Sequence, residues 1–492
     1  MRRSFLPARV PGSWNGSSVM ATYESFIGLE IHIHLQTRSK LFCSCRAHYG
    51  DQPNTNVCPV CLGYPGVLPA ANKEAVKQSF LVCRALNCAL AERGTFDRKN
   101  YFYPDMSKNY QISQFHSPFG TDGWIEFELN GEVKRVGIHD VHLEEDAGKM
   151  IHEGNRSLID YNRAGSSLLE IVTQPDLKTG EEAEAFLQTF RRMVRYLGVC
   201  DGNMEEGSLR CDANVSVNTQ GDGLGSKVEI KNMNSFRFVR KALNYEIKRQ
   251  RKALKAGKTV VQETRLWDED KNVSLGMRTK EHAHDYRYFP EPDLPPFIPD
   301  DQFLKAVDAA MVELPLSRKT RLIEQYGLNT EQAAYLRDEK DTADYFEAVV
   351  AQGAEPELTA KWIMGNVAKQ LNRLGVGPYD SAMTVERLAS LLRMLADGTI
   401  HGNIAQNVLD AVFEENADPE TIIESRGWQA STDNSEIEAL VEKVMEENPQ
   451  VVEKIRAGDN KPRGFIVGQV MKATEGTADP QLIQSLIDKY VQ

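Results

Sequence analysis

Four cysteines lie close together near the start of the chain, as two tight pairs. Cys43 and Cys45 form the first pair, and Cys58 and Cys61 form the second. Zinc binds four thiolates in a tetrahedron, and two close pairs joined by a loop can supply them without distorting the backbone. A four-thiolate site has no open position for substrate, so the quartet predicts a rigid scaffold rather than a reactive centre. Two disulfides or four unrelated thiols are the alternatives, although structural disulfides belong mainly to oxidising compartments.

A second group of chemically capable side chains lies just before these cysteines. Residues 26–35 alternate strictly between apolar and polar side chains. In a strand, this alternation places Glu30, His32 and His34 on one face. A solvated polar face is the ordinary explanation. A face with carboxylate and imidazole groups can also bind a cation, so both interpretations stay open.

Further carboxylates occur beside apolar strand sequence. Glu170 has apolar neighbours on both sides, and a buried carboxylate is costly unless it is paired or binds a cation. If a strand ends near Glu144, this residue shares a face with His142, whereas Glu145 shares the other face with Leu143. Either acid could point at a metal. The ligands expected for a magnesium or manganese ion are Glu30, His32, Glu170 and one of Glu144 and Glu145.

Basic side chains are interleaved with these acids. Lys99, Arg163 and Lys231 could neutralise phosphate, because magnesium-assisted phosphoryl transfer needs cations around the developing charge. A surface or ion-pair role is the alternative for each. The acidic segment 204–212 could contact substrate. A salt bridge between its acids and Arg210 is the alternative.

Three segments look like known motifs but lack the required context. Residues 256–259 end like a phosphate-binding loop, yet they follow a basic helix and Lys252 replaces the leading glycine. Residues 221–225 lie between two strand-like runs, which predicts a hairpin turn rather than a dinucleotide loop. The adjacent serines 166 and 167 lack the glycine and lysine framework of an amidase nucleophile. We therefore expect no glutaminase centre in this chain.

Composition limits the class of protein. With 492 residues, of which 41% are hydrophobic and 26% charged, the chain can build several cores, and we expect about three domains. A net charge of −12 disfavours indiscriminate nucleic-acid binding and leaves room only for a local basic patch. No apolar run approaches the roughly 20 residues of a membrane span.

The pattern along the chain predicts the elements that position these groups. Residues 23–300 are strand-rich with inserted helices at 72–87 and from about 179, which predicts an α+β domain with a mixed or antiparallel sheet. A proline-rich segment, 285–299, marks its end. Helical periodicity then predicts an all-α domain at 301–417 and a small α-helical tail domain at 418–492.

Residues 1–22 form a separate leader. They contain three arginines, several serines and no acid, as a transit peptide would. However, Pro7 and Pro11 interrupt the helix that such a peptide needs, and Met20 offers a second start site. We expect a disordered leader rather than a targeting signal, and a cytoplasmic protein.

From about residue 23 to its end, the chain closely resembles the B subunit of the tRNA-dependent amidotransferases. These enzymes convert Glu-tRNA(Gln) to Gln-tRNA(Gln) and Asp-tRNA(Asn) to Asn-tRNA(Asn). The resemblance is carried by five separated blocks: Ile27-Gly-Leu-Glu-Ile-His32, Asn54-Thr-Asn-Val-Cys-Pro-Val-Cys-Leu-Gly63, Asp97-Arg-Lys-Asn-Tyr-Phe-Tyr-Pro104, Glu205-Glu-Gly-Ser-Leu-Arg-Cys-Asp-Ala-Asn214 and His284-Asp-Tyr-Arg-Tyr-Phe-Pro-Glu-Pro-Asp293.

The resemblance implies a cradle domain that acts as a kinase. It would use ATP to phosphorylate the side-chain carboxylate of the misacylated tRNA, which ammonia then attacks. Ammonia would come from glutamine, hydrolysed by a partner amidase, the A subunit, with a small C subunit completing the heterotrimer. By analogy, the family's divalent-metal positions correspond to Glu30, His32, one of Glu144 and Glu145, and Glu170.

The resemblance also implies that the helical and tail domains hold the tRNA. A local excess of basic residues surrounds the matching tail segment 464–472 and suits shape-based docking through phosphates and sugars. A solvated helical face is the alternative. The expected tRNA-contacting residues are Lys454, Arg456, Lys461, Arg463 and Lys472.

Three positions depart from the family pattern: Ser166-Ser167, His34 and Pro462-Arg463 stand where other residues are usual. The competing hypothesis is a non-catalytic, zinc-containing tRNA-binding translation factor, in which the acids are solvated. A metal-dependent hydrolase that needs no tRNA is a third. The sequence leaves open whether Glu-tRNA(Gln), Asp-tRNA(Asn) or both are substrates.

Overall fold

The computed structural model describes residues 22–277, 286–429, 434–474 and 477–491. The chain forms two compact units, Met1–Met311 and Val312–Gln492. Almost all of the expected leader, and His284 and Asp285 of the last resemblance block, lie outside the described residues.

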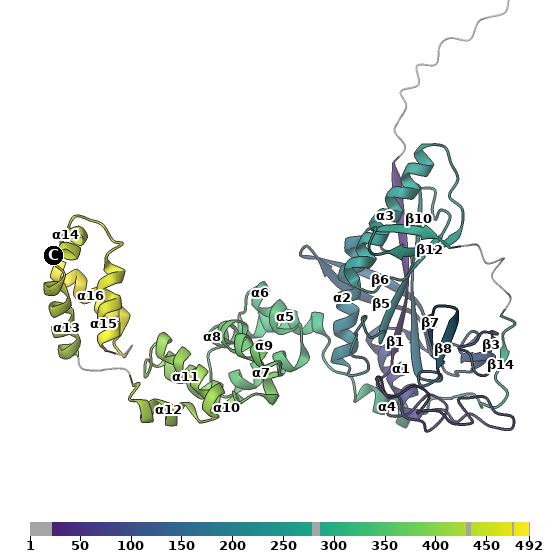
Figure 1. Cartoon of the computed structure of the whole chain (residues 1–492), viewed down its shortest axis with the longest axis horizontal. Helices are drawn as coiled ribbons and strands as arrows, with labels where there is room; N and C mark the ends of the chain where they lie inside the picture. The colour runs from purple at the N-terminus through teal and green to yellow at the C-terminus, as the bar shows by residue number, and fades with distance from the viewer. Residues whose placement is uncertain (1–21, 278–285, 430–433, 475–476, 492) are drawn as a thin grey trace, which may run out of the picture. The chain divides into compact units, whose positions relative to one another are not determined.

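A nine-stranded sheet forms the framework of the first unit (Figure 1). The strand order is β13-β12-β11-β10-β1-β9-β6-β5-β2, and among the paired strands only β11 and β12 run parallel. The expected α+β fold with a mixed sheet is therefore confirmed. The strands are β1 (Tyr23–His34), β2 (Ala89–Leu90), β5 (Gly120–Leu129), β6 (Glu132–Glu145), β9 (Ser167–Thr173), β10 (Leu209–Thr219), β11 (Val228–Lys231), β12 (Glu263–Asp268) and β13 (Val273–Gly276).

The alternation of β1 separates an apolar from a polar face. Ile31 and Ile33 are fully buried, whereas His32 and His34 are only partly buried on the opposite face. The strand lies between β10 and β9 in the interior of the sheet. Its polar face therefore meets side chains from neighbouring strands as well as solvent.

Three helices associated with the sheet begin at side-chain caps. Helices α1 (Lys73–Ala85) and α2 (Gly180–Tyr196) confirm the expected helices, and Asn72 and Thr179 cap their first turns. Helix α3 (Phe236–Lys255) begins after Ser235. Helices α2 and α3 lie side by side along the sheet (Figure 1), where α2 packs on β5 and α3 on β10.

Two smaller sheets complete the first unit. The three-stranded sheet contains β14 (Phe289–Pro290), β3 (Asp97–Asn100) and β4 (Tyr110–Ser113), and β4 packs against β6. Strands β7 (Lys149–Glu153) and β8 (Arg156–Asp160) pair as a hairpin. The segment at 221–225 joins the antiparallel strands β10 and β11, as the sequence predicts.

The first unit extends beyond the boundary expected at residue 300. Helix α4 (Asp301–Asp308) packs on α1, with the Phe303 and Phe80 ring centroids 5.2 Å apart. Arg84 of α1 also pairs with Asp308 at 3.0 Å. Aromatic packing and this ion pair hold α4 to the first unit.

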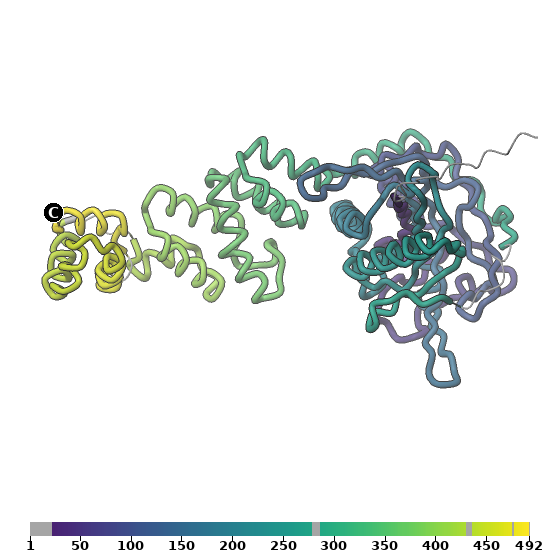
Figure 2. The backbone as a smooth tube through the Cα atoms, turned by 90° about the horizontal axis from the view of Figure 1, so that it is seen from above, coloured from purple at the N-terminus to yellow at the C-terminus, as the bar shows by residue number. Residues whose placement is uncertain are grey.

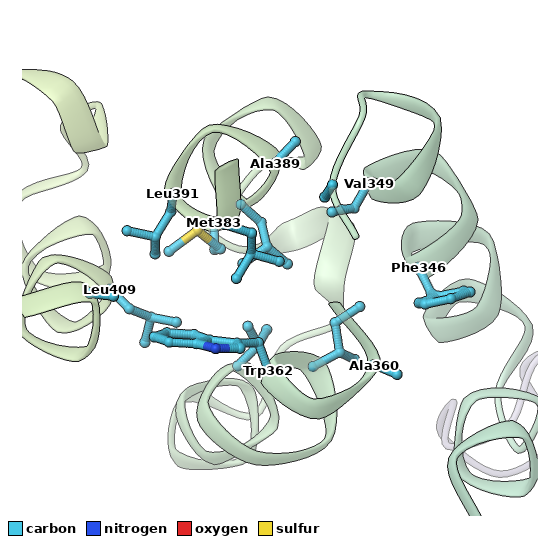
Figure 3. Close-up of a cluster of buried hydrophobic side chains, with 14 of the residues drawn as sticks. Phe346, Val349, Ala360, Trp362, Met383, Ala389, Leu391 and Leu409 are labelled. Atoms are coloured by element: carbon cyan, nitrogen blue, oxygen red, sulfur yellow. The ribbon is translucent and has the colours of Figure 1, made fainter. Parts of the chain in front are cut away.

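The second unit is helical throughout its described part (Figure 2). Its buried hydrophobic side chains form two separate cores. Trp362, Met383 and Leu409 are among the side chains of the first core (Figure 3). Its elements are α5 (Pro315–Tyr326), α6 (Thr330–Leu336), α7 (Lys340–Ala351), α8 (Pro356–Trp362), η1 (Ile363–Val367), α9 (Ala368–Leu374), η2 (Pro378–Asp380), α10 (Val385–Ala396), α11 (Gly402–Glu415) and α12 (Pro419–Arg426).

The tail core begins later than expected. Ile422 and Ile423 of α12 are buried in the first core, so α12 does not belong to the tail despite lying beyond residue 418. The tail core contains α13 (Asn434–Glu447), α14 (Pro449–Arg456), α15 (Arg463–Ala473) and α16 (Pro480–Val491). None of the helices in the described parts of the chain has the length and apolarity needed to cross a membrane.

Gly180, the first residue of α2, allows this helix to approach α3 closely. A Cβ atom at this position would lie 2.5 Å from the carbonyl oxygen of Arg240. We expect Gly180→Ala to push the helices apart and to destabilise the first unit by roughly 1–3 kcal/mol. Hydrogen–deuterium exchange of α2 and α3 peptides should show this as faster amide exchange.

Gly402→Ala is the matched control. Gly402 also begins a helix, but a Cβ there would meet nothing within 4 Å. This variant should leave exchange in α11 unchanged or slower. Unchanged protection of α2 and α3 in Gly180→Ala would show that the close approach is unimportant.

Candidate active site

Three neighbouring strands bring His32, Glu170 and His142 into one row across the sheet. His32 of β1 lies opposite Glu170 of β9, which lies opposite His142 of β6. The Nε2 atom of His32 lies 3.2 Å from Oε2 of Glu170, and Nε2 of His142 lies 3.0 Å from the same oxygen. One carboxylate therefore contacts two imidazoles.

Glu30 and Glu144 flank this row on the same face. An oxygen of each carboxylate lies 3.8 Å from Nε2 of His32. Ser113 of β4 donates a hydrogen bond of 3.1 Å to Glu144. The side chain of Glu144 is 4% exposed and that of Glu170 is 13% exposed, so these two acids are shielded from water rather than solvated.

We call these five residues, Glu30, His32, His142, Glu144 and Glu170, the acid cluster. They shift each other's pKa. Burial raises the pKa of Glu144, and the charge of Glu170 raises it further. Burial and Glu170 raise the pKa of Glu30 in the same way. Burial alone would lower the pKa of His142, but its hydrogen bonds with Asp140 and Glu170 raise it to about 10. Burial would raise the pKa of Glu170, but its hydrogen bonds with His142 and His32 lower it.

Two overlapping sets of metal-ligating atoms share Glu170. Glu30, His32 and Glu170 form the first set, and His142, Glu144 and Glu170 form the second. Within each set, the atoms lie within 4.8 Å of one another. Carboxylate oxygens with an imidazole nitrogen suit magnesium or manganese. The donor set therefore fits such a cation.

Glu144, rather than Glu145, belongs to the acid cluster. Glu145 is ion-paired with Lys108 and accepts a 2.9 Å hydrogen bond from the backbone N–H of Ile112. It lines a small pocket with Lys108 and Cys61 beside the cysteine loop. Strand alternation separates the two acids, which sequence reasoning left as alternatives.

The three candidate phosphate-binding cations lie in different environments. Lys99 of β3 lies near the acid cluster: burial would lower its pKa, but the charges of Glu144 and Glu170 raise it. Lys231 of β11 pairs with Asp212 at 2.5 Å. Asp212 belongs to β10 and lies opposite Glu30 of β1 in the strand pairing.

Arg163 instead supports a neighbouring loop. Its guanidinium donates hydrogen bonds to the carbonyl oxygens of Ala147 and Gly148, at 3.0 and 2.8 Å. It also lies 3.3 Å from Asp146. The guanidinium of Arg163 is therefore occupied by contacts with residues 146–148, and Arg163 contacts neither ligand set through them.

His34 belongs to a second charged group next to the acid cluster. Its Nε2 lies 2.7 Å from Asp146, which also pairs with Arg210 at 2.8 Å. Burial would raise the pKa of Asp146, but the positive charges of Arg210 and Arg163 lower it strongly. His34 therefore makes a polar contact rather than a contribution to either ligand set.

The four cysteines of the quartet are brought together. One sulfur from each of Cys43, Cys45, Cys58 and Cys61 lies within 4.8 Å of the others, so the group fits a tetrahedral zinc ion. The fully buried Lys40 donates to Cys61 at 3.6 Å. Its ammonium group would offset part of the charge of four thiolates around one zinc ion.

The expected tRNA-contacting residues lie on the tail core. Lys454, Lys461 and Lys472 are exposed. The remaining two have partners within the tail: Arg456 donates to the carbonyl oxygen of Tyr490, and Arg463 is ion-paired with Asp488.

Sequence reasoning did not select His142 and Asp140 as site residues. His142 stands two positions before Glu144, and Asp140 two positions before His142. In a strand, alternation places both on the same face as Glu144, so it could have added them to the candidates.

Known proteins resemble this chain over most of its length. The model of the "GatB/GatE catalytic domain" matches residues 25–305, and that of the "GatB domain" matches residues 344–491. The B subunit of the aspartyl/glutamyl-tRNA(Asn/Gln) amidotransferase of Carboxydothermus hydrogenoformans is 48% identical over 95% of this chain and 98% of its own. The corresponding protein of Brevibacillus brevis is 46% identical over 96% and 99%.

Opposite stability effects are expected for the two adjacent acids. In EDTA, Glu144→Gln removes a buried charge next to Glu170, so its melting temperature should match or exceed that of the parent. Glu145→Gln leaves Lys108 without its buried counter-charge and should lower stability by roughly 3 kcal/mol. Calorimetry of the two variants compares them directly, and equal destabilisation by both would contradict the assignment.

Proposed function

Because the chain belongs to the B-subunit family of the aspartyl/glutamyl-tRNA(Asn/Gln) amidotransferases, we propose that its acid cluster activates the side-chain carboxylate of a misacylated tRNA. The substrates are Glu-tRNA(Gln), Asp-tRNA(Asn) or both, and the products are Gln-tRNA(Gln) and Asn-tRNA(Asn). The observation that carries the proposal is the shielded row of His32, Glu170 and His142, flanked by Glu30 and Glu144, within the region matched by the catalytic-domain model.

The first step brings an anionic carboxylate against an anionic nucleotide and transfers a phosphoryl group between them. A carboxylate oxygen attacks the γ-phosphorus of ATP, the bond to the bridging oxygen breaks, and ADP leaves. Ammonia then attacks the acyl phosphate, releasing phosphate and a proton and forming the amide. A bound magnesium or manganese ion would neutralise charge between the two anions.

The chain's own residues hold and orient these groups. Glu30, His32, Glu144, Glu170 and His142 supply the two ligand sets on rigid strands. The charges of Glu144 and Glu170 act on Lys99, which makes this lysine a candidate to neutralise a phosphate at the acids. Lys231 is a second candidate beside Glu30, whereas the hydrogen bonds of Arg163 favour a supporting role.

We propose that the cysteine quartet holds a structural zinc ion. The quartet and Lys40 lie on the segment that follows β1, the strand that carries Glu30 and His32. Glu145 and Cys61 line the same small pocket. Zinc would therefore brace the chain beside the acid cluster without taking part in the reaction.

The remaining functions require partners. We propose that an amidase, the A subunit, releases ammonia from glutamine and that a small C subunit completes the complex. The exposed Lys454, Lys461 and Lys472 of the tail are proposed to contact tRNA phosphates.

The alternative, a non-catalytic zinc-containing translation factor, requires solvated acids. Glu144 is instead almost fully buried, next to another carboxylate. Burying repelling acids costs stability unless a cation binds them, and a binding module would have no use for such a site. The acid cluster therefore favours the enzyme.

Glu170→Gln tests the proposed reaction. Glu170 belongs to both ligand sets and contacts both imidazoles, so its replacement should lower ATP-dependent amidation at least roughly 100-fold. The assay measures ADP and Gln-tRNA(Gln) formed from Glu-tRNA(Gln) by the reconstituted complex.

Glu126→Gln is the control, because this acid pairs with Arg135 at the surface of β5. It should retain normal amidation. Glutaminase activity should persist in both variants if the complex assembles. Normal amidation by Glu170→Gln would refute the catalytic role of the acid cluster.

Cys43→Ser tests the zinc proposal. We expect the parent to contain about one zinc ion per chain and the variant to contain far less, with a lower melting temperature. Metal analysis by mass spectrometry and calorimetry provide the two measurements. Cys200→Ser, which alters a buried cysteine outside the quartet, should keep its zinc. Equal zinc content in Cys43→Ser and the parent would rule out the four-cysteine site.

A further inference from the structure

Two aromatic rings stack on each other at the surface of the three-stranded sheet. Phe115, just after β4, and Tyr288, just before β14, have ring centroids 4.2 Å apart and planes inclined by 14°. Phe115 is nevertheless 59% exposed. The stacked rings therefore form a flat apolar surface in which Tyr288 supports Phe115 and much of Phe115 remains open to solvent.

The Tyr288 segment is anchored to β3 by charge and backbone contacts. Arg98 donates to both carboxylate oxygens of the buried Glu291, at 2.6 and 2.9 Å. Asn100 donates from its side chain to the carbonyl oxygen of Arg287 at 2.7 Å. A bidentate arginine–carboxylate pair restricts orientation as well as distance. Tyr288 therefore lies in a short segment fixed at both ends.

Phe115 is anchored to the same strand. The carboxylate of Asp97 accepts hydrogen bonds from the backbone N–H groups of Phe115 and His116, at 2.9 and 3.0 Å. Asp97 is itself buried. The two rings are thus held by neighbouring residues of β3, which gives a rigid platform rather than a chance contact.

This aromatic platform lies at the edge of the acid cluster. Ser113, two residues before Phe115, donates to Glu144. Burial raises the pKa of Tyr288, and the charges of Glu144 and Glu170 act on it in the same direction. The Nζ atom of Lys99 lies 5.1 Å from the ring centroid of Tyr286 in the same segment. Tyr286 in turn contacts Tyr288 edge to face, with ring centroids 6.2 Å apart, so this contact links Lys99 to the stacked rings.

We propose that an adenine ring stacks on Phe115 during the reaction. This inference rests on the proposed function, which supplies two sources of adenine: ATP, and the terminal adenosine of the tRNA that carries the amino acid. Stacking on aromatic side chains is a general means of holding nucleobases and tolerates any base with an open π face. The platform would place the base while Lys99 and the acid cluster act on the attached or neighbouring phosphate.

Phe115→Leu removes the π face but keeps an apolar side chain against Tyr288. Phe102→Leu is the matched control, because Phe102 is 87% exposed and has no ring partner among the described residues. We expect Phe115→Leu to raise KM for one adenine-bearing substrate roughly tenfold. The control should keep both KM values, and Phe115→Trp should restore the affected one.

The assay uses the complete complex and varies ATP and Glu-tRNA(Gln) separately. A rise in KM for ATP alone assigns the platform to the adenine of ATP. A rise in KM for Glu-tRNA(Gln) alone assigns it to the terminal adenosine of the tRNA. In the second case, 2-aminopurine at the terminal position should be quenched by the parent complex and less by Phe115→Leu.

Unchanged KM values, or equal rises for both substrates, would overturn the proposal, because one ring face stacks one base. Failure of the proposed function gives a different result. In that case the parent complex itself would form no ADP with Glu-tRNA(Gln), whereas failure of the platform alone leaves amidation normal in Phe115→Leu and lost in Glu170→Gln.

Discussion

The pairing register of three strands is the constraint on which the site depends. Because β1, β9 and β6 pair with His32, Glu170 and His142 in line, two imidazoles contact one carboxylate. A shift of one residue in either pairing would turn the strand's polar side chains into the apolar core. The fully buried isoleucines of β1 oppose such a shift, so hydrophobic burial on one face sets the geometry of charge on the other.

The buried acids in and around the site are compensated by different positive groups. Asp146 is neutralised by His34 and Arg210, and Glu145 by Lys108. The acid cluster has its own imidazoles and the charge of Lys99, yet burial and the charge of Glu170 still raise the pKa of Glu144. Structural acids with permanent partners thus surround acids whose charge a divalent cation would balance. This contrast supports a binding role for the cluster.

The small three-stranded sheet packs against the strand that carries Glu144. Strand β4 supplies Ser113 to Glu144, and β3 supplies Lys99 and the anchors of the Phe115–Tyr288 stack. Residues separated by almost 200 positions, Arg98 and Glu291, are joined in this sheet. The acids on the large sheet therefore interact with a serine and a lysine of the small sheet.

Local sequence patterns determined the α+β and all-α division, the polar face of β1 and the grouping of the four cysteines, because alternation and close spacing act over a few residues. They also predicted the capped helices α1 and α2. Only the tertiary structure decided that Glu144 rather than Glu145 joins the cluster, that Arg163 supports a loop, and that α4 and α12 extend the preceding cores. Those outcomes depend on strand register, ion pairs and packing between distant segments, which no short stretch of sequence contains.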